Sequence, residues 1–454
     1  MEQTDRKQTY DFTHGSVLKP LLRFMLPVLA ALLIQSLYSS VDLMIVGQFG
    51  TAVNVSGVSV GGGLTFMVQM FITALSMGST ILLGQYLGEK RKEEAGRVVG
   101  TTVILFAGIA LAFMILLFAL AVPMLQLLQT PSEALAEGTA YVRICSIGML
   151  FIVAYNVSGS IFRGIGDSRT PLIAVAVACV VNIAGDLLLV GVFHMAAAGA
   201  AIATVFAQAV SVAISLFLIR KKGMPFPFGK ENLHLDASIA KAVFRLGAPL
   251  AIQEIVISIS FLVVASITNQ LGVVASASAG VAGRLITFIM LLPSAYAQAL
   301  SAFVAQNIGA RRLDRAKKAL LHGIWTSLVF ATVMFFFSGL HGTWLTSIFT
   351  REPEVVTGAA QYLLAYGIDT FLTSFLFCLI GYFNGCGLTR ITLIQGAIGV
   401  LVRIPAAILI SHSSIASLFT IACSTPISTV IQIIFCGIYF FCTREKIKRQ
   451  YGGS

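Results

Sequence analysis

The stretch VVNIAGDLLLVGVF, Val180 to Phe193, is almost entirely apolar, yet it contains an aspartate, Asp186, four residues after an asparagine, Asn182. Four residues are about one helical turn, so the two polar side chains would lie on the same face of a helix. What the pair means depends on whether that helix lies in water or in lipid, and this question decides the fold.

The composition of the chain indicates that this helix lies in lipid. The 454 residues are 57% hydrophobic and 11% charged, with a mean hydropathy of +0.91, whereas soluble domains are about 25% charged. A helix that crosses a bilayer needs about 20 mainly apolar residues. We therefore predict an all-α integral membrane protein with twelve transmembrane helices. They are expected near residues 20–46, 54–83, 98–122, 140–162, 171–192, 197–219, 243–269, 276–305, 319–340, 358–384, 391–411 and 415–441.

The basic residues predict the orientation of these helices. The net charge is +11, and nearly all of the 30 Lys and Arg lie in the two tails and the even-numbered connections. Examples are the clusters Glu89–Arg97, Arg220–Lys222 and Arg311–Lys318. Basic residues collect on the cytoplasmic side of membrane proteins, which predicts that both termini are cytoplasmic. No aromatic pattern typical of nucleic-acid binding accompanies the clusters, so no nucleic-acid partner is expected.

Two further features concern the terminus and the cysteines. The polar first eighteen residues contain no apolar core, so we expect no cleavable signal peptide. The seven cysteines lie in or beside apolar segments without a CxxC pair, so we expect neither a disulfide framework nor cysteine metal ligands.

The chain is an internal duplication. A shift of 222 residues aligns RFMLP (Arg23–Pro27) with RLGAP (Arg245–Pro249), and a shift of 221 aligns QYLGEKRKEEA (Gln85–Ala95) with QNIGARRLDRA (Gln306–Ala316). Two units of six spans each would insert with the same orientation, as parallel repeats do, and substrate would bind between them. The predicted parts are a cytoplasmic segment 1–19, a six-helix bundle 20–220, a cytoplasmic linker 221–241, a second six-helix bundle 242–442 and a cytoplasmic tail 443–454.

Several motifs resemble those of multidrug and toxic compound extrusion (MATE) transporters. They are SLYSSVDLMIVGQFG (Ser36–Gly50), QYLGEKRKEEA, FRGIGDSRTPL (Phe162–Leu172), NIAGDLLLVG (Asn182–Gly191) and GAAIATVFAQ (Gly199–Gln208). Their order, spacing and repetition extend the resemblance over nearly the whole chain.

The resemblance implies a secondary antiporter that exports bulky, often cationic organic compounds in exchange for protons or sodium ions by alternating access. It would be a monomer in a prokaryotic plasma membrane, with no cofactor other than the coupling ion. Export of xenobiotics would make it a drug-resistance protein.

Four acids fall inside predicted spans: Asp42, Asp186, Glu254 and Asp369. Each costs about 2.5 to 3.5 kcal/mol at the centre of a membrane helix, so such residues usually face a cavity or a partner and are functional candidates. The structural alternative is a carboxyl group that bonds a neighbouring helix or pairs with Arg284 or Arg403.

Asp42 and Asp186 form the first predicted site. Gln35, Tyr38, Ser39 and Asp42 have the spacing i, i+3, i+4, i+7 of one helical face. The predicted topology places Asp42 and Asp186 at similar depth, where both cannot ionise cheaply, so at least one should hold a proton near neutrality. With both ionised, their oxygens would suit a small hard cation such as sodium. The predicted coupling-ion site consists of Asp42, Asn182, Asp186 and Thr204.

The duplication provides an internal comparison for this site. Asp42 corresponds to Val264, and the other three members correspond to Arg403, Ala407 and Thr425. If the acids were needed only to build a six-span unit, the second half would need them too. Their asymmetry therefore favours a functional role.

Other candidates are ranked below this site. A secondary ion or substrate site would consist of Glu254, Asp369 and Arg403. Substrate-cavity candidates are Gln35, Tyr38, Tyr155, Asn156 and Arg284. Pro27, which matches Pro249, is either a hinge of the first span or a static bend, because proline removes a helical hydrogen bond.

Functions of other classes are less consistent with the sequence. No HExxH or P-loop pattern is present and the six histidines are isolated, so we do not expect an enzyme. A channel fits duplicated halves less well than alternating access does. The nearest alternative is a flippase for lipid-linked sugars, but such proteins carry more basic charge in the cavity than Arg284 and Arg403 would supply.

Overall fold

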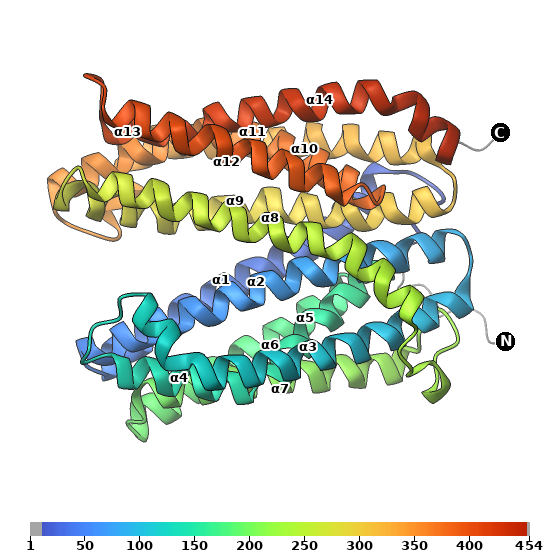
Figure 1. Ribbon diagram of the computed structural model, residues 1–454, viewed down its shortest axis with the longest axis horizontal. Coiled ribbons are helices and arrows are strands. Elements are labelled where there is room, and N and C mark those ends of the chain that lie inside the picture. Colours follow the sequence, from blue (N-terminus) through green and yellow to red (C-terminus); the bar gives the residue numbers. More distant parts are fainter. Residues whose placement is uncertain (1–10, 452–454) are drawn as a thin grey trace. The chain divides into compact units, whose positions relative to one another are not determined.

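The computed structural model describes the backbone of residues 11–451 and the side chains of residues 11–442. Throughout this part the regular elements are helices (Figure 1). The first half contains α1 (Leu18–Phe49), α2 (Ala52–Gly88), α3 (Lys92–Leu127), α4 (Leu135–Ile147), α5 (Met149–Gly164), α6 (Arg169–Asp186), the π-helix η1 (Leu187–Val192) and α7 (Ala196–Lys222). The linker contains a 3-10 turn, η2 (Lys230–Asn232). The second half contains α8 (Ala237–Asn269), α9 (Val273–Gly309), α10 (Leu313–Ser347), α11 (Pro353–Gly385), α12 (Thr389–Ser411), α13 (Leu418–Ala422) and α14 (Ser424–Tyr451).

The predicted set of transmembrane helices is confirmed. In the described part of the chain, 11 helices are long and apolar enough to cross a membrane, and the bent pair α4–α5 brings the number to 12. Helices satisfy their backbone hydrogen bonds internally, which is why lipid-exposed segments adopt this structure. The chain is thus a multi-pass membrane protein with six spans in each half.

The fourth span is bent by 59° between α4 and α5, at Gly148. A side chain at this position would place its Cβ 2.4 Å from the Cγ atoms of Val205 on α7, so the glycine lets α7 approach the backbone closely. The equivalent residue of the second half, Asp369, lies within the uninterrupted helix α11. The two halves therefore differ in the shape of one span.

The fifth span changes helix type directly after Asp186, where α6 ends and the π-helix η1 begins. The Phe193 N–H donates to the carbonyl oxygen of Leu188, five residues earlier. Short π-helical turns are rare and occur frequently at functional sites. Hydropathy predicted this span as one regular helix and gave no sign of the change.

The chain folds into two compact units. The first unit contains Ala30–Ala251, and within it α6 packs on α7 and α2 packs on α4 and α5. The second unit contains Asp11–Leu29 and the chain from Ile252 onward, and within it α9, α10 and α11 pack together. The helices α1 and α8 each begin in one unit and end in the other.

The beginning of α8 packs closely on α2 within the first unit. A Cβ atom at Gly247 would lie 2.0 Å from the carbonyl oxygen of Leu75, and one at Gly78 would lie 2.3 Å from that of Val243. Small residues allow the backbones of membrane helices to approach in this way.

Gly247→Ala should destabilise the protein because the added methyl group overpacks the contact, which costs about 1–3 kcal/mol. The measurement is the midpoint temperature of thermal unfolding in detergent. Gly63→Ala on α2 is the matched control, since nothing lies within 4 Å of a Cβ atom there. Equal midpoints for the two variants would show that the helices do not approach this closely.

Candidate functional site

The structure places Asp42 of α1 and Asp186 of α6 beside each other in the first unit. Their carboxyl groups are close enough to interact electrostatically. The side chain of Asp42 is 8% exposed and that of Asp186 is 0% exposed. Two acidic groups therefore share one enclosed place in the membrane part of the protein.

Most polar atoms at this place lack a hydrogen-bond partner. Within the described residues, no donor or acceptor is bonded to Asp42 Oδ1, to either carboxylate oxygen of Asp186, or to the amide oxygen and nitrogen of Asn182. Leaving a buried polar group unpaired costs about 1–3 kcal/mol. A group of five such atoms needs an explanation, and carboxylate and amide oxygens of this kind suit a proton or a small hard cation.

Further polar residues surround the pair. Thr204 on α7, which is 7% exposed, interacts with the hydroxyl of Tyr141 on α4. The Gln208 amide donates to the Tyr38 hydroxyl at 3.2 Å. Cys145 on α4 also lies close to Asp42.

Sequence reasoning did not single out Tyr141, Cys145 or Gln208. A signal for Gln208 was present, because a buried polar stripe runs along α7 with the spacing i, i+4, i+7, i+11. It consists of Thr204, Gln208, Ser211 and Ser215. No comparable pattern marks the two residues on α4.

The remaining cavity candidates of the first unit have different surroundings. Gln35 and Tyr155 are half-buried. Asn156 is buried, and its side chain accepts from the Thr73 hydroxyl at 2.8 Å and donates to the Ile152 carbonyl at 2.8 Å. The side-chain oxygen of Asn156 therefore joins α5 to α2, and its amide nitrogen bonds within α5.

The second unit contains the other acids. Asp369 on α11 accepts hydrogen bonds from the hydroxyls of Thr373 at 3.0 Å and Thr429 at 2.6 Å. Arg403 on α12 lies over the ring of Phe261, with its guanidinium carbon 4.5 Å from the ring centroid. It also donates to the hydroxyl of Ser260 on α8 at 3.3 Å.

These charged residues are not joined into one cluster of direct contacts. Asp369 and Arg403 are close enough to interact electrostatically, but they form no ion pair. Glu254 is half-buried on α8 and, like the exposed Arg284 on α9, has no hydrogen-bond or ion-pair partner among the residues that the structure describes. The secondary site is thus less assembled than the first.

The equivalents of Asp42 and Asp186 in the second unit are buried apolar residues. Val264 on α8 and Ala407 on α12 are 1% and 0% exposed and belong to one apolar cluster. Equivalent positions are therefore acidic in the first unit and apolar in the second. The fold does not require acids at these positions.

The family model MatE matches the chain twice, over residues 27–188 and 249–409. The chain belongs to the MATE transporter family. Its two matches follow the internal duplication, one in each half.

Two curated relatives of this MATE transporter are bacterial. It is 31% identical over 358 residues to the probable multidrug resistance protein YoeA of Bacillus subtilis strain 168, covering 77% of each chain. It is 28% identical to the probable multidrug resistance protein YpnP of the same organism, covering 78% of this chain and 80% of the relative. Among solved structures, a MOP superfamily transporter from Pyrococcus furiosus superposes with a TM-score of 0.90 over 100% of both chains at 20% identity, which shows the fold.

Asp42→Asn and Asp186→Asn should each raise the stability of the protein, because an amide can donate to the neighbouring carboxyl and removes a buried acid. The expected gain is about 1–3 kcal/mol, seen as a higher midpoint of thermal unfolding in detergent. The double variant should gain less than the sum of the single variants, because the two groups are in contact.

Asp167→Asn is the matched control for this prediction. The Asp167 carboxylate accepts from the backbone N–H groups of Arg169 and Thr170 at 3.0 Å and lies 3.6 Å from the Lys222 ammonium group. Its replacement should lower the midpoint. Equal losses for Asp167→Asn and Asp186→Asn would contradict the unpartnered geometry of Asp186.

Proposed function

We propose that this MATE transporter is a secondary antiporter that exports bulky, often cationic organic compounds in exchange for protons or sodium ions. The coupling ion binds at Asp42 and Asp186, assisted by Asn182 and Thr204. The observation that supports this site is the pair of adjacent, enclosed carboxyl groups with unpartnered oxygens. Its replacement by Val264 and Ala407 in the other half supports a role beyond folding.

Protons and sodium ions would use this site differently. One proton on either carboxyl group relieves the repulsion between Asp42 and Asp186. A sodium ion would instead be bound by both carboxylates together with the side-chain oxygens of Asn182 and Thr204. Binding of either ion neutralises an acidic pair that is costly in the membrane. The free energy gained in this way favours the state of the carrier that binds the ion more tightly.

A second set of charges would serve a secondary role. Glu254, Asp369 and Arg403 in the second unit are proposed as a further ion or substrate site. Asp369 is already held by two threonine hydroxyls, which makes it less available than Asp186. Gln35, Tyr38, Tyr155, Asn156 and Arg284 are the proposed substrate contacts.

The protein would work in a prokaryotic plasma membrane as a monomer, with both termini in the cytoplasm. The basic clusters in the tails and even-numbered connections support this orientation. The alternative function is a flippase for lipid-linked sugars. Among the described residues, Arg403 has no carboxylate within ion-pair distance, and a free guanidinium group would suit such an anionic substrate.

Asp186→Asn should abolish gradient-driven transport because the amide cannot release or take up the coupling ion. The measurement is ethidium uptake into everted membrane vesicles, under an imposed proton gradient and separately under an imposed sodium gradient. The initial rate should fall at least about tenfold for the same amount of inserted protein. The gradient that drives uptake by the unchanged protein identifies the ion.

Two further variants make this test specific. Glu133→Gln changes an exposed acid of the α3–α4 connection and should transport normally. Asp369→Asn should slow transport less than Asp186→Asn. The opposite ranking would move the coupling site to the second unit, and absence of uptake under both gradients would favour the flippase.

Pro27 is proposed as a hinge of α1. It lies two residues before Leu29, where α1 leaves the second unit, and Pro249 lies two residues before Ala251, where α8 leaves the first. Pro27→Ala restores a helical hydrogen bond and should stiffen α1. The rate of ethidium uptake should fall roughly several-fold, because substitutions at hinges slow conformational steps. The affinity for ethidium in detergent should be retained. An unchanged rate would leave Pro27 as a static bend.

A further inference from the structure

The segment before α1 is bound tightly to the second unit. We name this segment, Asp11–Val17, the strap. The Phe12 ring is fully buried, stacks on Phe303 of α9 with centroids 4.8 Å apart, and meets the edge of Phe24 of α1 at 5.2 Å. Burying a Phe side chain stabilises a contact by about 1.5–3 kcal/mol. The strap is thus anchored by an apolar side chain at its start.

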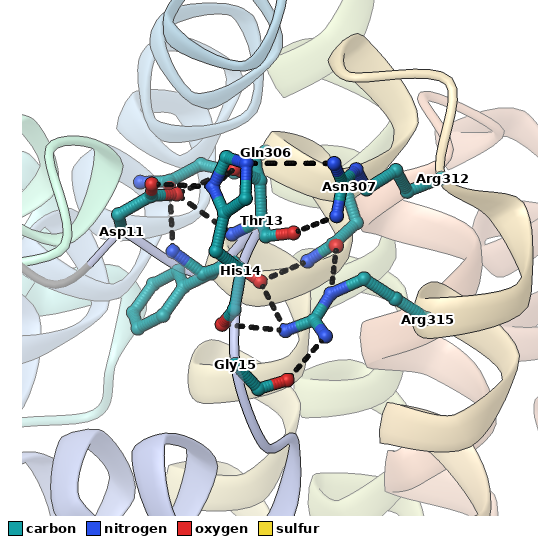
Figure 2. Close-up of polar contacts among 9 residues, drawn as sticks. Asp11, Thr13, His14, Gly15, Gln306, Asn307, Arg312 and Arg315 are labelled. Carbon is teal, nitrogen blue, oxygen red and sulfur yellow. Dashed lines mark hydrogen bonds and ion pairs between the residues drawn. The ribbon is translucent and has the colours of Figure 1, made fainter.

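Two arginines at the beginning of α10 hold the backbone of the strap (Figure 2). Arg312 donates to one carbonyl oxygen at 2.7 Å, and Arg315 donates to three at 2.6 to 3.0 Å. The acceptors are the carbonyl groups of Thr13 for Arg312 and of Phe12, His14 and Gly15 for Arg315. Asn307 adds a bond to the Phe12 carbonyl at 3.1 Å and accepts from Arg315 Nε at 3.2 Å. Hydrogen bonds from a charged donor are about twice as strong as neutral ones.

The strap also has its own internal turn. Asp11 accepts from the backbone N–H of Thr13 at 2.8 Å and from its hydroxyl at 2.5 Å, and its other oxygen lies 2.8 Å from His14 Nδ1. Burial raises the pKa of the Asp11 carboxyl, but the hydrogen bonds from Thr13 and His14 lower it by more. The pKa of Asp11 therefore lies below its ordinary value. The ionised carboxylate therefore helps to fix the loop that presents its carbonyl groups to the arginines.

In the first half, the equivalent residues at the start of α3 pair with each other instead of binding a preceding segment. Arg312 and Arg315 correspond to Arg91 and Glu94. Arg91 Nη2 lies 3.0 Å from Glu94 Oε1, so the charges of that half neutralise each other. In the second half both positions are basic, which leaves two guanidinium groups to bind the strap.

The linker occupies a similar place on the first unit. Thr101 of α3 donates to the carbonyl oxygen of His234 and accepts from the N–H of Asp236, both at 3.3 Å. A Cβ atom at Gly100 would lie 1.8 Å from the carbonyl oxygen of Asn232, so linker and helix are in close backbone contact. The segment before the first span of each half is therefore held by the unit that contains most of the other half.

We propose that Arg312 and Arg315 are positioning residues for transport, because they hold the strap and so fix the inner end of α1 to the second unit. Asp42 lies twelve residues beyond Ala30, about 18 Å along the same helix axis, in the first unit. When ion binding changes the first unit, a fixed inner end makes α1 bend, whereas a loose end would let the helix follow passively. This inference rests on the proposed antiport.

The test is a double-mutant cycle on ethidium uptake into everted vesicles, with rates divided by the amount of inserted protein. Arg312→Ala with Arg315→Ala should lower the initial rate about tenfold, and deletion of residues 2–15 should do the same. The combination should be no slower than the deletion alone, because arginines that act only through the strap have nothing left to hold. Phe12→Ala replaces the deletion in the cycle if the deleted protein fails to insert.

A purely structural role of the arginines would give a different result. It would lower ethidium affinity in detergent together with the rate, and its effect would add to that of the deletion. The proposal requires an affinity within about twofold of the unchanged protein. Arg91→Ala is the matched control and should transport normally. A normal rate for the arginine variant, or additive losses in the cycle, would overturn the proposal.

A second measurement does not depend on transport. Thr13→Cys, made in a protein whose exposed Cys442 is replaced by Ala, is tested with a membrane-impermeant maleimide in everted vesicles. The side chain at position 13 is 8% exposed, so labelling should be slow and should become about tenfold faster with Arg312→Ala and Arg315→Ala. Equal labelling rates would overturn the docking of the strap. If the unchanged protein transports nothing, the antiport proposal fails and this labelling still decides on the docking.

Discussion

The exclusion of water from the spans is the constraint on which the rest of the structure depends. Backbone groups in lipid must bond to one another, so the chain becomes a series of long helices. Any polar side chain left among them must find a partner or cost stability. Among the described residues, Asp42, Asn182 and Asp186 together have five buried polar atoms without a hydrogen-bond partner. The equivalents of the two acids, Val264 and Ala407, are apolar, so the fold can avoid this cost. An acidic pair kept under these conditions is consistent with function maintained at the expense of stability.

The positions of the spans could be predicted because hydropathy depends only on composition over about 20 residues. Irregularities within the spans could not. At the bend, Val205, which lies far away in sequence, occupies the space that a side chain at Gly148 would need. The π-helix after Asp186 contains no proline in its sequence. Such features are set by packing between helices, and no periodicity along one helix records them.

In the candidate site, too, some residues could be predicted from the sequence and others could not. Asp42 and Asp186 were predictable because a carboxyl group in an apolar segment is conspicuous and the duplication showed that the fold does not need it. Tyr141 and Cys145 were not predictable, because both residue types also occur as ordinary packing residues in membrane helices. Asn156, which the sequence suggested for the cavity, instead bonds to Thr73 on α2 through its oxygen and to Ile152 in its own helix through its amide nitrogen. A polar residue in a span is therefore informative only when its hydrogen bonds are known.

Basic residues at the ends of spans have two uses that sequence alone does not separate. The predicted effect of the cluster Arg311–Lys318 on the orientation of the chain depends on its charge alone, and any arrangement of the same charges would have it. Arg312 and Arg315 additionally form hydrogen bonds whose geometry is fixed, and their acceptors are backbone carbonyl groups. A guanidinium group can serve several such acceptors at once, which a lysine ammonium group on a flexible stem does less well. In the proposed mechanism, these bonds hold the inner end of α1, and the basic residues at the start of α10 thereby affect how that helix moves.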